Sequence, residues 1–158
     1  MILIGDSSAL IALAICDALD LLTELYENVY VPQAVYLEIV QGDRPESDKL
    51  RRYLREKVKN VDMTNYVYLD AYADIGETEA MLLYKQLSAD VLLVDDKKGR
   101  KVAKMNKIEI IGSLGILLKA KKRGLLNEVS TSLKRLQNSI IYLNQTLINE
   151  VLELAGER

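Results

Sequence analysis

The sequence predicts an α/β fold with a mainly parallel β-sheet. Short apolar segments alternate with longer segments of helical periodicity, which is the pattern of successive βαβ units. Residues 2–5 are a short run that is apolar on both faces, as in a parallel sheet covered by helices. The strongest strand candidate, residues 90–94, ends directly before Asp95 and Asp96.

The remaining elements follow in order from apolar runs and local stop signals. The expected strands are residues 2–5, 28–31, 58–63, 90–94 and 108–111. The expected helices are residues 9–16, 21–26, 33–41, 49–57, 76–87, 97–105 and 114–122. Ser7 or Ser8 suits the cap of the first helix, and Pro32 suits the first turn of the third. Gly42 and Gly124 suit helix ends, and residues 65–75 have no clear assignment.

The length of 158 residues fits one domain spanning residues 1–158. Its core is expected at about residues 1–124, followed by a C-terminal α/β extension at about 125–158. The extension is expected to contain a helix, a short strand at residues 140–143 and a last helix from Gln145. No apolar run approaches the ~20 residues that span a bilayer, and no signal peptide is recognisable. We therefore expect a cytoplasmic protein without a membrane partner.

The chain contains no histidine and a single cysteine. These counts exclude Ser-His-Asp and Cys-His nucleophile systems, His-ligated zinc, four-cysteine zinc sites and an internal disulfide. Cys16 lies in an apolar helix, which favours inert packing. An enzyme of this composition has to use carboxylates, hydroxyls, Lys, Arg, Tyr or a metal bound by oxygen. The net charge of −2 gives no argument for nucleic-acid binding, so local clusters have to carry it.

Polar side chains follow several of the predicted strands at the point where each strand ends. They are Asp6, the pair Asp95 and Asp96, and Ser113. Because parallel strands end at one edge of a sheet, we expect these groups to converge there. Each also fits the simpler role of a helix N-cap, but a cap needs only one of two adjacent aspartates.

Two glutamates on predicted helices are candidates for the same site. Glu38 has apolar neighbours on nearly every side, so we expect it to be buried and to need a partner. That partner is either a basic side chain such as Arg44 or a metal at the sheet edge. Glu77 and Glu79 both suit a helix N-terminus. Glu79, one turn before Leu83, lies closer to the apolar face and is the preferred candidate.

Asp6, Glu38, Glu79 and one or both of Asp95 and Asp96 would form an acidic cluster. Clustered carboxylates raise one another's pKa unless a cation neutralises them. Oxygen ligands favour Mg²⁺ or Mn²⁺, and such an ion supports phosphodiester hydrolysis without histidine.

Basic residues follow the acidic pair in the next helix, at Lys97, Lys98, Arg100, Lys101 and Lys104. A helix N-terminus is unfavourable for cations, which favours phosphate contacts over a merely solvated face. A second basic run at Lys119, Lys121, Lys122 and Arg123 ends its helix, where cations are favourable without any ligand.

These residues resemble the PIN (PilT N-terminus) domain family, metal-dependent ribonucleases that include VapC-type toxins. The matching features are Asp6-Ser7-Ser8, Val31-Pro32 with Val35 and Glu38, Gly76-Glu77-Thr78-Glu79-Ala80, and Val94-Asp95-Asp96. The resemblance covers roughly residues 1–124. Gly112-Ser113-Leu114-Gly115 and the end of the tail look like a poorly characterised prokaryotic branch of stand-alone members.

The resemblance implies a three-layer α/β/α, Rossmann-like fold with about five strands, and an endoribonuclease of the kind found as the toxin of a VapBC-type toxin–antitoxin pair. It implies Mg²⁺ or Mn²⁺, an RNA substrate, a homodimer and a cognate antitoxin. The implied residues are Asp6, Glu38, Glu79 and Asp96 for catalysis, Asp6, Glu79, Asp95 and Asp96 for metal, Ser7 and Ser113 as supporting hydroxyls, and Lys97, Lys98 and Arg100 for RNA.

The chain departs from the family pattern at two acidic positions. Glu79 stands where many members have Asp, and Val94-Asp95-Asp96 stands where many have a hydroxyl, a spacer and then Asp. Asp96 is the favoured counterpart, and Asp95 stays open.

Other functions are also considered. A PIN-scaffold module that is catalytically weak or inactive, and that binds RNA or a partner protein, is the main alternative. A response-regulator receiver is disfavoured because the Asp pair follows a late strand. A nucleotide-binding Rossmann enzyme is disfavoured because no Gly-x-Gly-x-x-Gly follows the first strand.

Overall fold

The computed structural model describes residues 1–62, 64, 69, 71 and 73–158. A five-stranded sheet with strand order β3-β2-β1-β4-β5 lies at its centre, and every neighbouring pair is parallel. The strands are β1 Ile2–Gly5, β2 Asn28–Pro32, β3 Val58–Lys59, β4 Val91–Leu93 and β5 Ile110–Ile111. The predicted parallel sheet is thus confirmed. Met63, at the end of the predicted third strand, and part of the unassigned segment 65–75 lie outside the described residues.

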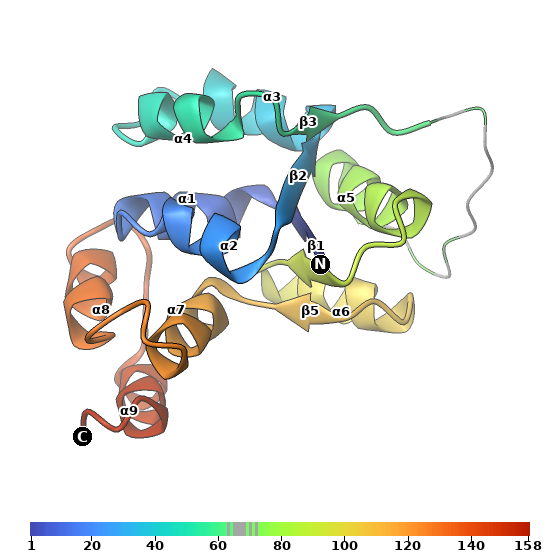
Figure 1. The fold of residues 1–158 in the computed structure, drawn as a ribbon. Helices are drawn as coiled ribbons and strands as arrows, with labels where there is room; N and C mark the ends of the chain where they lie inside the picture. Colours follow the sequence, from blue (N-terminus) through green and yellow to red (C-terminus); the bar gives the residue numbers. More distant parts are fainter. Residues whose placement is uncertain (63, 65–68, 70, 72) are drawn as a thin grey trace.

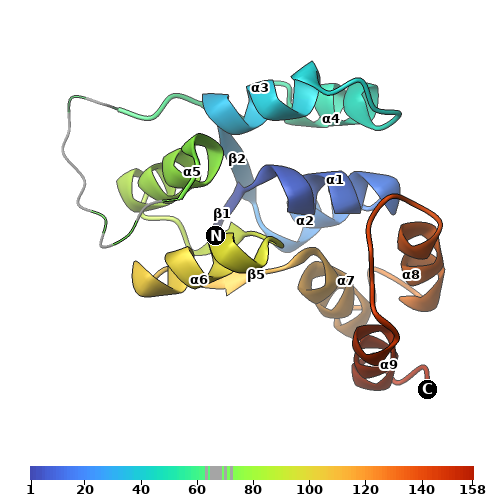
Figure 2. The ribbon, with the colours of Figure 1, turned by 180° about the vertical axis from the view of Figure 1, so that it is seen from behind.

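Helices cover both faces of the sheet, which gives the three predicted layers (Figure 1). The helices are α1 Ser7–Ile15, α2 Leu19–Leu25, α3 Gln33–Gln41, α4 Ser47–Leu54, α5 Ile75–Gln86, α6 Lys97–Met105, α7 Ser113–Lys122, α8 Ser130–Gln137 and α9 Gln145–Leu154. Helices α5 and α6 pack together on one face, and α1, α2 and α7 lie on the other (Figure 2). No helix among the described residues is long and apolar enough to cross a membrane.

Alternate side chains of the central strands enter two separate apolar cores. In β1, Leu3 packs with α1, α2 and α7, while Ile4 packs with α5 and α6. In β4, Leu93 and Leu92 divide in the same way. All four side chains are at most 3% exposed. This explains why the strands read as continuous apolar runs, because both of their faces are buried.

Several local predictions were wrong. The third strand ends at Lys59 and not at residue 63, and Pro32 is the last residue of β2 and the N-cap of α3, outside its first turn. Neither Ser7 nor Ser8 caps α1, because the helix already begins at Ser7 and its N-cap residue is Asp6. Residues 140–143 form no strand, so the extension consists of helices and irregular segments. Ile141 and Leu143 pack against the core while Ile140 and Tyr142 point to solvent. The segment therefore has the side-chain alternation of a strand without a partner strand.

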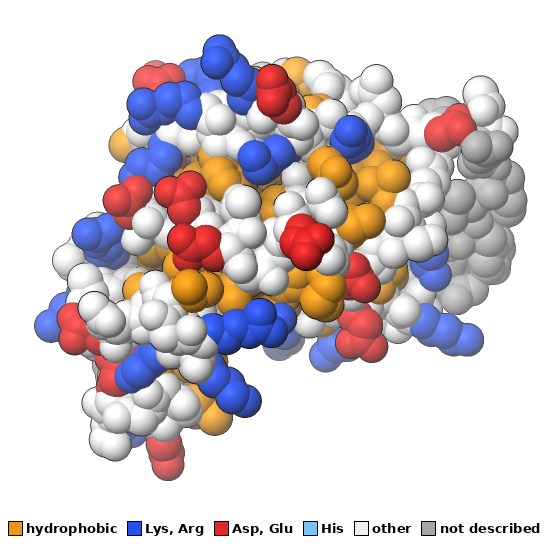
Figure 3. All heavy atoms as spheres, in the orientation of Figure 1, with side chains coloured by type: hydrophobic (Ala, Val, Ile, Leu, Met, Phe, Trp, Pro, Cys, Tyr) orange, Lys and Arg blue, Asp and Glu red, His pale blue; other side chains and the backbone are white. Residues whose placement is uncertain are grey.

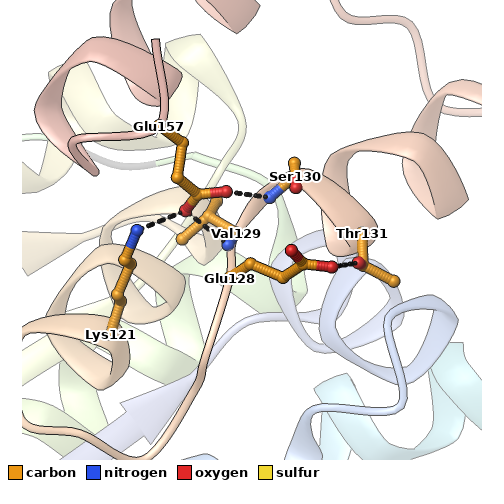
Figure 4. Close-up of polar contacts among 6 residues, drawn as sticks. All are labelled: Lys121, Glu128, Val129, Ser130, Thr131 and Glu157. Carbon is orange, nitrogen blue, oxygen red and sulfur yellow. Dashed lines mark hydrogen bonds and ion pairs between the residues drawn. The ribbon is translucent and has the colours of Figure 1, made fainter.

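The C-terminal extension is fixed to the core by a carboxylate near its end. Glu157 forms an ion pair with Lys121 of α7 at 2.8 Å, and it accepts hydrogen bonds from the N–H groups of Val129 and Ser130 (Figure 4). Burial opposes ionisation, but these partners outweigh it and lower the pKa of Glu157 to about 2. Glu157 thereby supplies the N-terminus of α8 with an acceptor and holds the chain end after α9 against α7.

Candidate metal and nucleic-acid site

The strand order places a topological switch point between β1 and β4. From β1 the chain proceeds outward to β2 and β3, and then returns to build β4 and β5 on the other side. Ligands of open α/β sheets bind outside the carboxyl ends of the strands at such a point. Asp6 follows β1 and donates its N–H to the Leu93 carbonyl at 2.9 Å, so it lies beside the end of β4. Of the Asp95–Asp96 pair, it is Asp96 whose charge acts on Asp6, so these two groups lie close together at this edge.

Asp6 is a buried carboxyl group, with 4% of the residue exposed. Burial, together with the nearby carboxylates of Glu38, Asp74 and Asp96, raises its pKa from 3.8 to about 6, against the lowering effect of the Ser7 N–H. Among the described residues no Lys or Arg forms an ion pair with Asp6. In the described part of the chain, the carboxyl group of Asp6 is therefore surrounded by other carboxylates and is not neutralised by an ion pair.

The N-terminus of α5 brings two further carboxyl groups to this edge. Asp74 caps α5 and accepts the Glu77 N–H at 2.8 Å. The Glu77 side chain reaches Gly99 in α6, where an added Cβ would lie 2.8 Å from Glu77 Oε1. Burial, followed by Asp74, Asp6 and Asp96, raises the pKa of Glu77 to about 7, and Glu77 also shares a hydrogen bond with the Asp96 carboxylate. Gly99 thus leaves the space in which Glu77 meets α6.

Glu38 of α3 and Glu79 of α5 are the two glutamates that were predicted for this site. The expected burial of Glu38 was wrong: the residue is exposed, because α3 covers the sheet edge and also leaves Leu37 41% exposed. Glu38 nevertheless reaches α5, where an added Cβ at Gly76 would lie 3.0 Å from Glu38 Oε2. Glu79 lines a shallow hollow between α3 and α5 together with Glu38 and Asp74. The charges of Asp6 and Asp96 act on Glu77, and both raise its pKa.

Asp95 and Asp96 have different partners. Both oxygens of Asp95 accept hydrogen bonds from Ser113, one from its N–H at 2.7 Å and one from its hydroxyl at 2.6 Å. Asp95 thus supplies the acceptor for α7, whose own N-cap residue Gly112 has no side chain. Asp96 caps α6 by accepting the Gly99 N–H at 2.8 Å. Its carboxylate also acts on Asp6 and Glu77.

We call Asp6, Glu38, Asp74, Glu77 and Asp96 the acidic cluster. Sequence analysis selected Asp6, Glu38 and Asp96 but not Asp74 or Glu77. A signal for both was present, because Asp74-x-x-Glu77 is a helix-start pattern that places two carboxyl groups in the first turn of one helix. Glu79, the glutamate preferred from the sequence, lies at a hollow with Glu38 and Asp74, and its part in a metal site stays a prediction.

The predicted phosphate-binding cations lie on α6, directly after Asp96. Lys97 and Lys98 are exposed, and Arg100 is half-buried with its Nη1 donating to the Val94 carbonyl at 3.3 Å. Lys101 and Lys104 continue the basic side of this helix and line a hollow with Lys97 and Arg100. Basic side chains also gather over α4 on another part of the surface (Figure 3). What distinguishes the α6 cations is that they begin beside the acidic cluster.

The donors of the acidic cluster suit a hard divalent cation. They are all carboxylate oxygens, and the raised pKa values of Asp6 and Glu77 reflect, besides burial, repulsion that a cation would relieve. Within the described part of the chain, no three acidic or cysteine side chains converge closely enough to form a ready-made site. Mg²⁺ commonly keeps several waters and takes one or two carboxylates, so the donor set fits such an ion.

Comparison with known proteins gave one family match. A family model described as a PIN domain matches residues 2–157. The matched range includes the whole sheet, the acidic cluster and both helices of the C-terminal extension. No curated protein sequence and no solved structure matched the chain.

Proposed function

The chain belongs to the PIN domain family, a family of nuclease type, and from that premise we propose that it is a metal-dependent endoribonuclease acting on RNA phosphodiester bonds. The acidic cluster at the β1–β4 switch point carries this proposal. Its carboxyl groups come from four places in the fold, because only Asp74 and Glu77 share an element, the start of α5. Asp6 is buried and has a pKa of about 6. Keeping such a group costs stability, which favours a role in ligand binding over a structural one.

We propose Asp6, Glu77 and Asp96 as the carboxylates that hold the cation, with Glu38 beside them. A bound Mg²⁺ or Mn²⁺ would supply the Lewis acid that polarises the phosphodiester and stabilises charge on the leaving oxygen. The Ser7 N–H orients the Asp6 carboxylate, and the Gly99 N–H orients that of Asp96. We propose Glu77 in place of Glu79, because the charges of Asp6 and Asp96 raise its pKa and its side chain shares a hydrogen bond with Asp96.

The other predicted residues have supporting roles in this proposal. Asp95 is a positioning residue, because its bonds to Ser113 tie the end of β4 to the start of α7. Lys97, Lys98 and Arg100 bind RNA phosphates next to the acidic cluster. Ser7 is a buried residue at the start of α1, and its hydroxyl stays a candidate for holding a water.

The experiment is RNA cleavage in Mn²⁺ by the parent and by Asp6→Asn, Glu77→Gln and Glu79→Gln. The two glutamate variants are a matched pair, since they make the same chemical change two residues apart. We expect Asp6→Asn and Glu77→Gln to lose about 100-fold or more of the rate, and Glu79→Gln to lose far less. EDTA removes the activity of the parent. Cleavage by Asp6→Asn at the parent rate contradicts the proposal.

A non-catalytic RNA- or protein-binding module is the second candidate. It is favoured by the observation that no three acidic side chains of the described residues form a ready-made metal site. RNA binding that persists in EDTA, together with no cleavage in Mg²⁺, Mn²⁺ or Co²⁺, selects this candidate.

The finer assignment, a VapBC-type toxin that acts as a homodimer, is part of the proposal. Growth arrest on expression, relieved by Asp6→Asn, tests the toxin role. A small protein that co-purifies with the chain and suppresses cleavage identifies the antitoxin. Light scattering on the purified chain tests the dimer.

A further inference from the structure

The C-terminal extension forms a groove against the start of α7. This extension groove has a volume of about 640 Å³. One wall is the end of β5 with the first turn of α7, and the other is α9 with the segment that joins it to α8. Its apolar lining includes Ile111, Leu136, Leu147 and Val151. A cavity of this size is within the range that holds a small planar ligand.

The groove is fixed before any ligand binds. The hydrogen bonds and ion pair of Glu157 hold the α8 N-terminus and the chain end after α9 against α7. On the opposite wall, Asp95 holds Ser113 through two hydrogen bonds. A preformed site does not need to be ordered during binding, which favours affinity for a small target.

An aromatic ring stands open at the mouth of the groove. Tyr142 lines the groove and is 85% exposed. Its neighbours in the chain, Ile141 and Leu143, are packed inward and hold the segment in place. An exposed tyrosine on an anchored segment offers a flat face for stacking, and aromatic side chains of this kind stack nucleobases in single-stranded nucleic-acid sites.

Cations line the end of the groove that faces the acidic cluster. Lys97 and Arg100 line both the extension groove and the hollow along α6 formed with Lys101 and Lys104. Arg100 lies against the start of α7, because an added Cβ at Gly112 would be 2.7 Å from Arg100 Nη1. A continuous cationic strip of Lys97, Arg100, Lys101 and Lys104 thus leads into an apolar groove. This combination is complementary to a nucleotide, which joins an anionic phosphate to a flat, largely apolar base.

We propose that the extension groove holds one base of a single-stranded RNA, stacked on Tyr142, while the flanking phosphates bind the cationic strip. This inference rests on the proposed function in that it takes RNA as the ligand. It adds a base-binding position outside the acidic cluster and gives the C-terminal extension a role in choosing the RNA. An acidic, apolar peptide is the competing occupant. It could pair with the cations, but it carries no flat base to stack on Tyr142 beside them.

The test is RNA binding in EDTA, so that cleavage does not interfere. Fluorescence anisotropy with a short labelled single-stranded oligoribonucleotide gives the Kd for the parent, Tyr142→Ala, Tyr142→Phe and Ile140→Ala. Ile140 is 95% exposed on the same segment but does not line the groove, so it is the matched control. We expect Tyr142→Ala to weaken binding about 5- to 100-fold, and the other two variants to bind like the parent.

Oligonucleotides with a single abasic position refine the result. Removing the base that occupies the groove weakens binding to the parent, but it weakens binding to Tyr142→Ala much less, because the stacking partner is already absent. Unchanged RNA affinity in Tyr142→Ala overturns the base-binding position and leaves the nuclease proposal intact. Absence of RNA binding by the parent also overturns the base-binding position, and the cleavage assay in Mn²⁺ then decides the nuclease proposal separately. If an acidic apolar peptide binds in a Tyr142-dependent way while RNA binding is independent of Tyr142, the groove is a protein-docking site.

Discussion

Replacing Asp6 with asparagine is expected to stabilise the folded protein while removing the proposed activity. Asp6 is 4% exposed, and burial together with Glu38, Asp74 and Asp96 raises its pKa from 3.8 to about 6. A raised carboxyl pKa means that ionisation is harder in the folded chain than in the unfolded chain, so ionised Asp6 destabilises the fold. Asparagine is neutral and of nearly the same shape, and its carbonyl oxygen can still accept the Ser7 N–H.

The size of the effect follows from the shift. A change from 3.8 to about 6 corresponds to about 3 kcal/mol at pH 8, where Asp6 is ionised in both states. Relaxation of the neighbouring carboxylates reduces this, so we expect a gain of about 2 kcal/mol in the free energy of unfolding, or about 4–8 °C in Tm. The gain declines as the pH falls below 6 and disappears below 3.8, because Asp6 is then protonated in both states.

Urea unfolding in EDTA, followed by circular dichroism at pH 8 and at pH 3.5, measures this difference. Asp43→Asn is the matched control, since it makes the same change at an exposed carboxylate. Adding Mn²⁺ at pH 8 is expected to raise the Tm of the parent but not that of Asp6→Asn. The reasoning is refuted if Asp6→Asn is no more stable than the parent at pH 8, or if its gain is equally large at pH 3.5.

Other expected outcomes concern Gly99, Glu157 and Cys16. Gly99→Ala places a Cβ 2.8 Å from Glu77 Oε1, so we expect Mn²⁺-dependent stabilisation and RNA cleavage to fall. The higher helix propensity of alanine keeps the Tm in EDTA close to that of the parent, and a fully active variant contradicts the role given to Gly99. Glu157→Gln lowers the free energy of unfolding by about 2 kcal/mol at pH 7. This loss shrinks between pH 4.5 and pH 2 because the folded-state pKa of Glu157 is about 2, and denaturant unfolding at several pH values measures whether it shrinks as the pH falls. Burial raises the pKa of Cys16 to about 11, so DTNB is expected to label it only after unfolding, and rapid labelling of the native chain counts against its packing.

Much of the fold could be predicted because burial on two sides leaves a strong signal. The central strands β1 and β4 are apolar without interruption, and α3 and α6 have the bounds that their flanking signals indicate. The errors occur where the deciding partner is distant in sequence. Residues 140–143 alternate like a strand, but no neighbouring strand is available for pairing, and Glu38 is exposed because α3 lies over the edge of the sheet. Neither fact can be read from local composition.

The candidate site was predictable to the level of its sheet edge but not of each side chain. Asp6 and Asp96 follow from the rule that parallel strands end together. The separation of Asp95 from the acidic cluster depends on Ser113, which is 18 residues away and becomes its neighbour only when β5 pairs with β4. The position of Glu77 likewise depends on Gly99, which lies in α6, a helix that follows later in the chain. Gly99 leaves the space that the Glu77 carboxylate occupies.

For Asp96, a cap and a ligand are compatible roles. The Gly99 N–H occupies Oδ2 of Asp96, which leaves the other oxygen for Glu77 or a cation. Capping also fixes the rotamer of Asp96, so the helix start serves to orient the site. The same helix then presents Lys97 and Arg100 to the extension groove. The short segment after β4 therefore connects the acidic cluster, the cationic strip and the proposed base-binding position. This explains why cations follow directly after an acidic cap, although the helix dipole makes that position unfavourable for them.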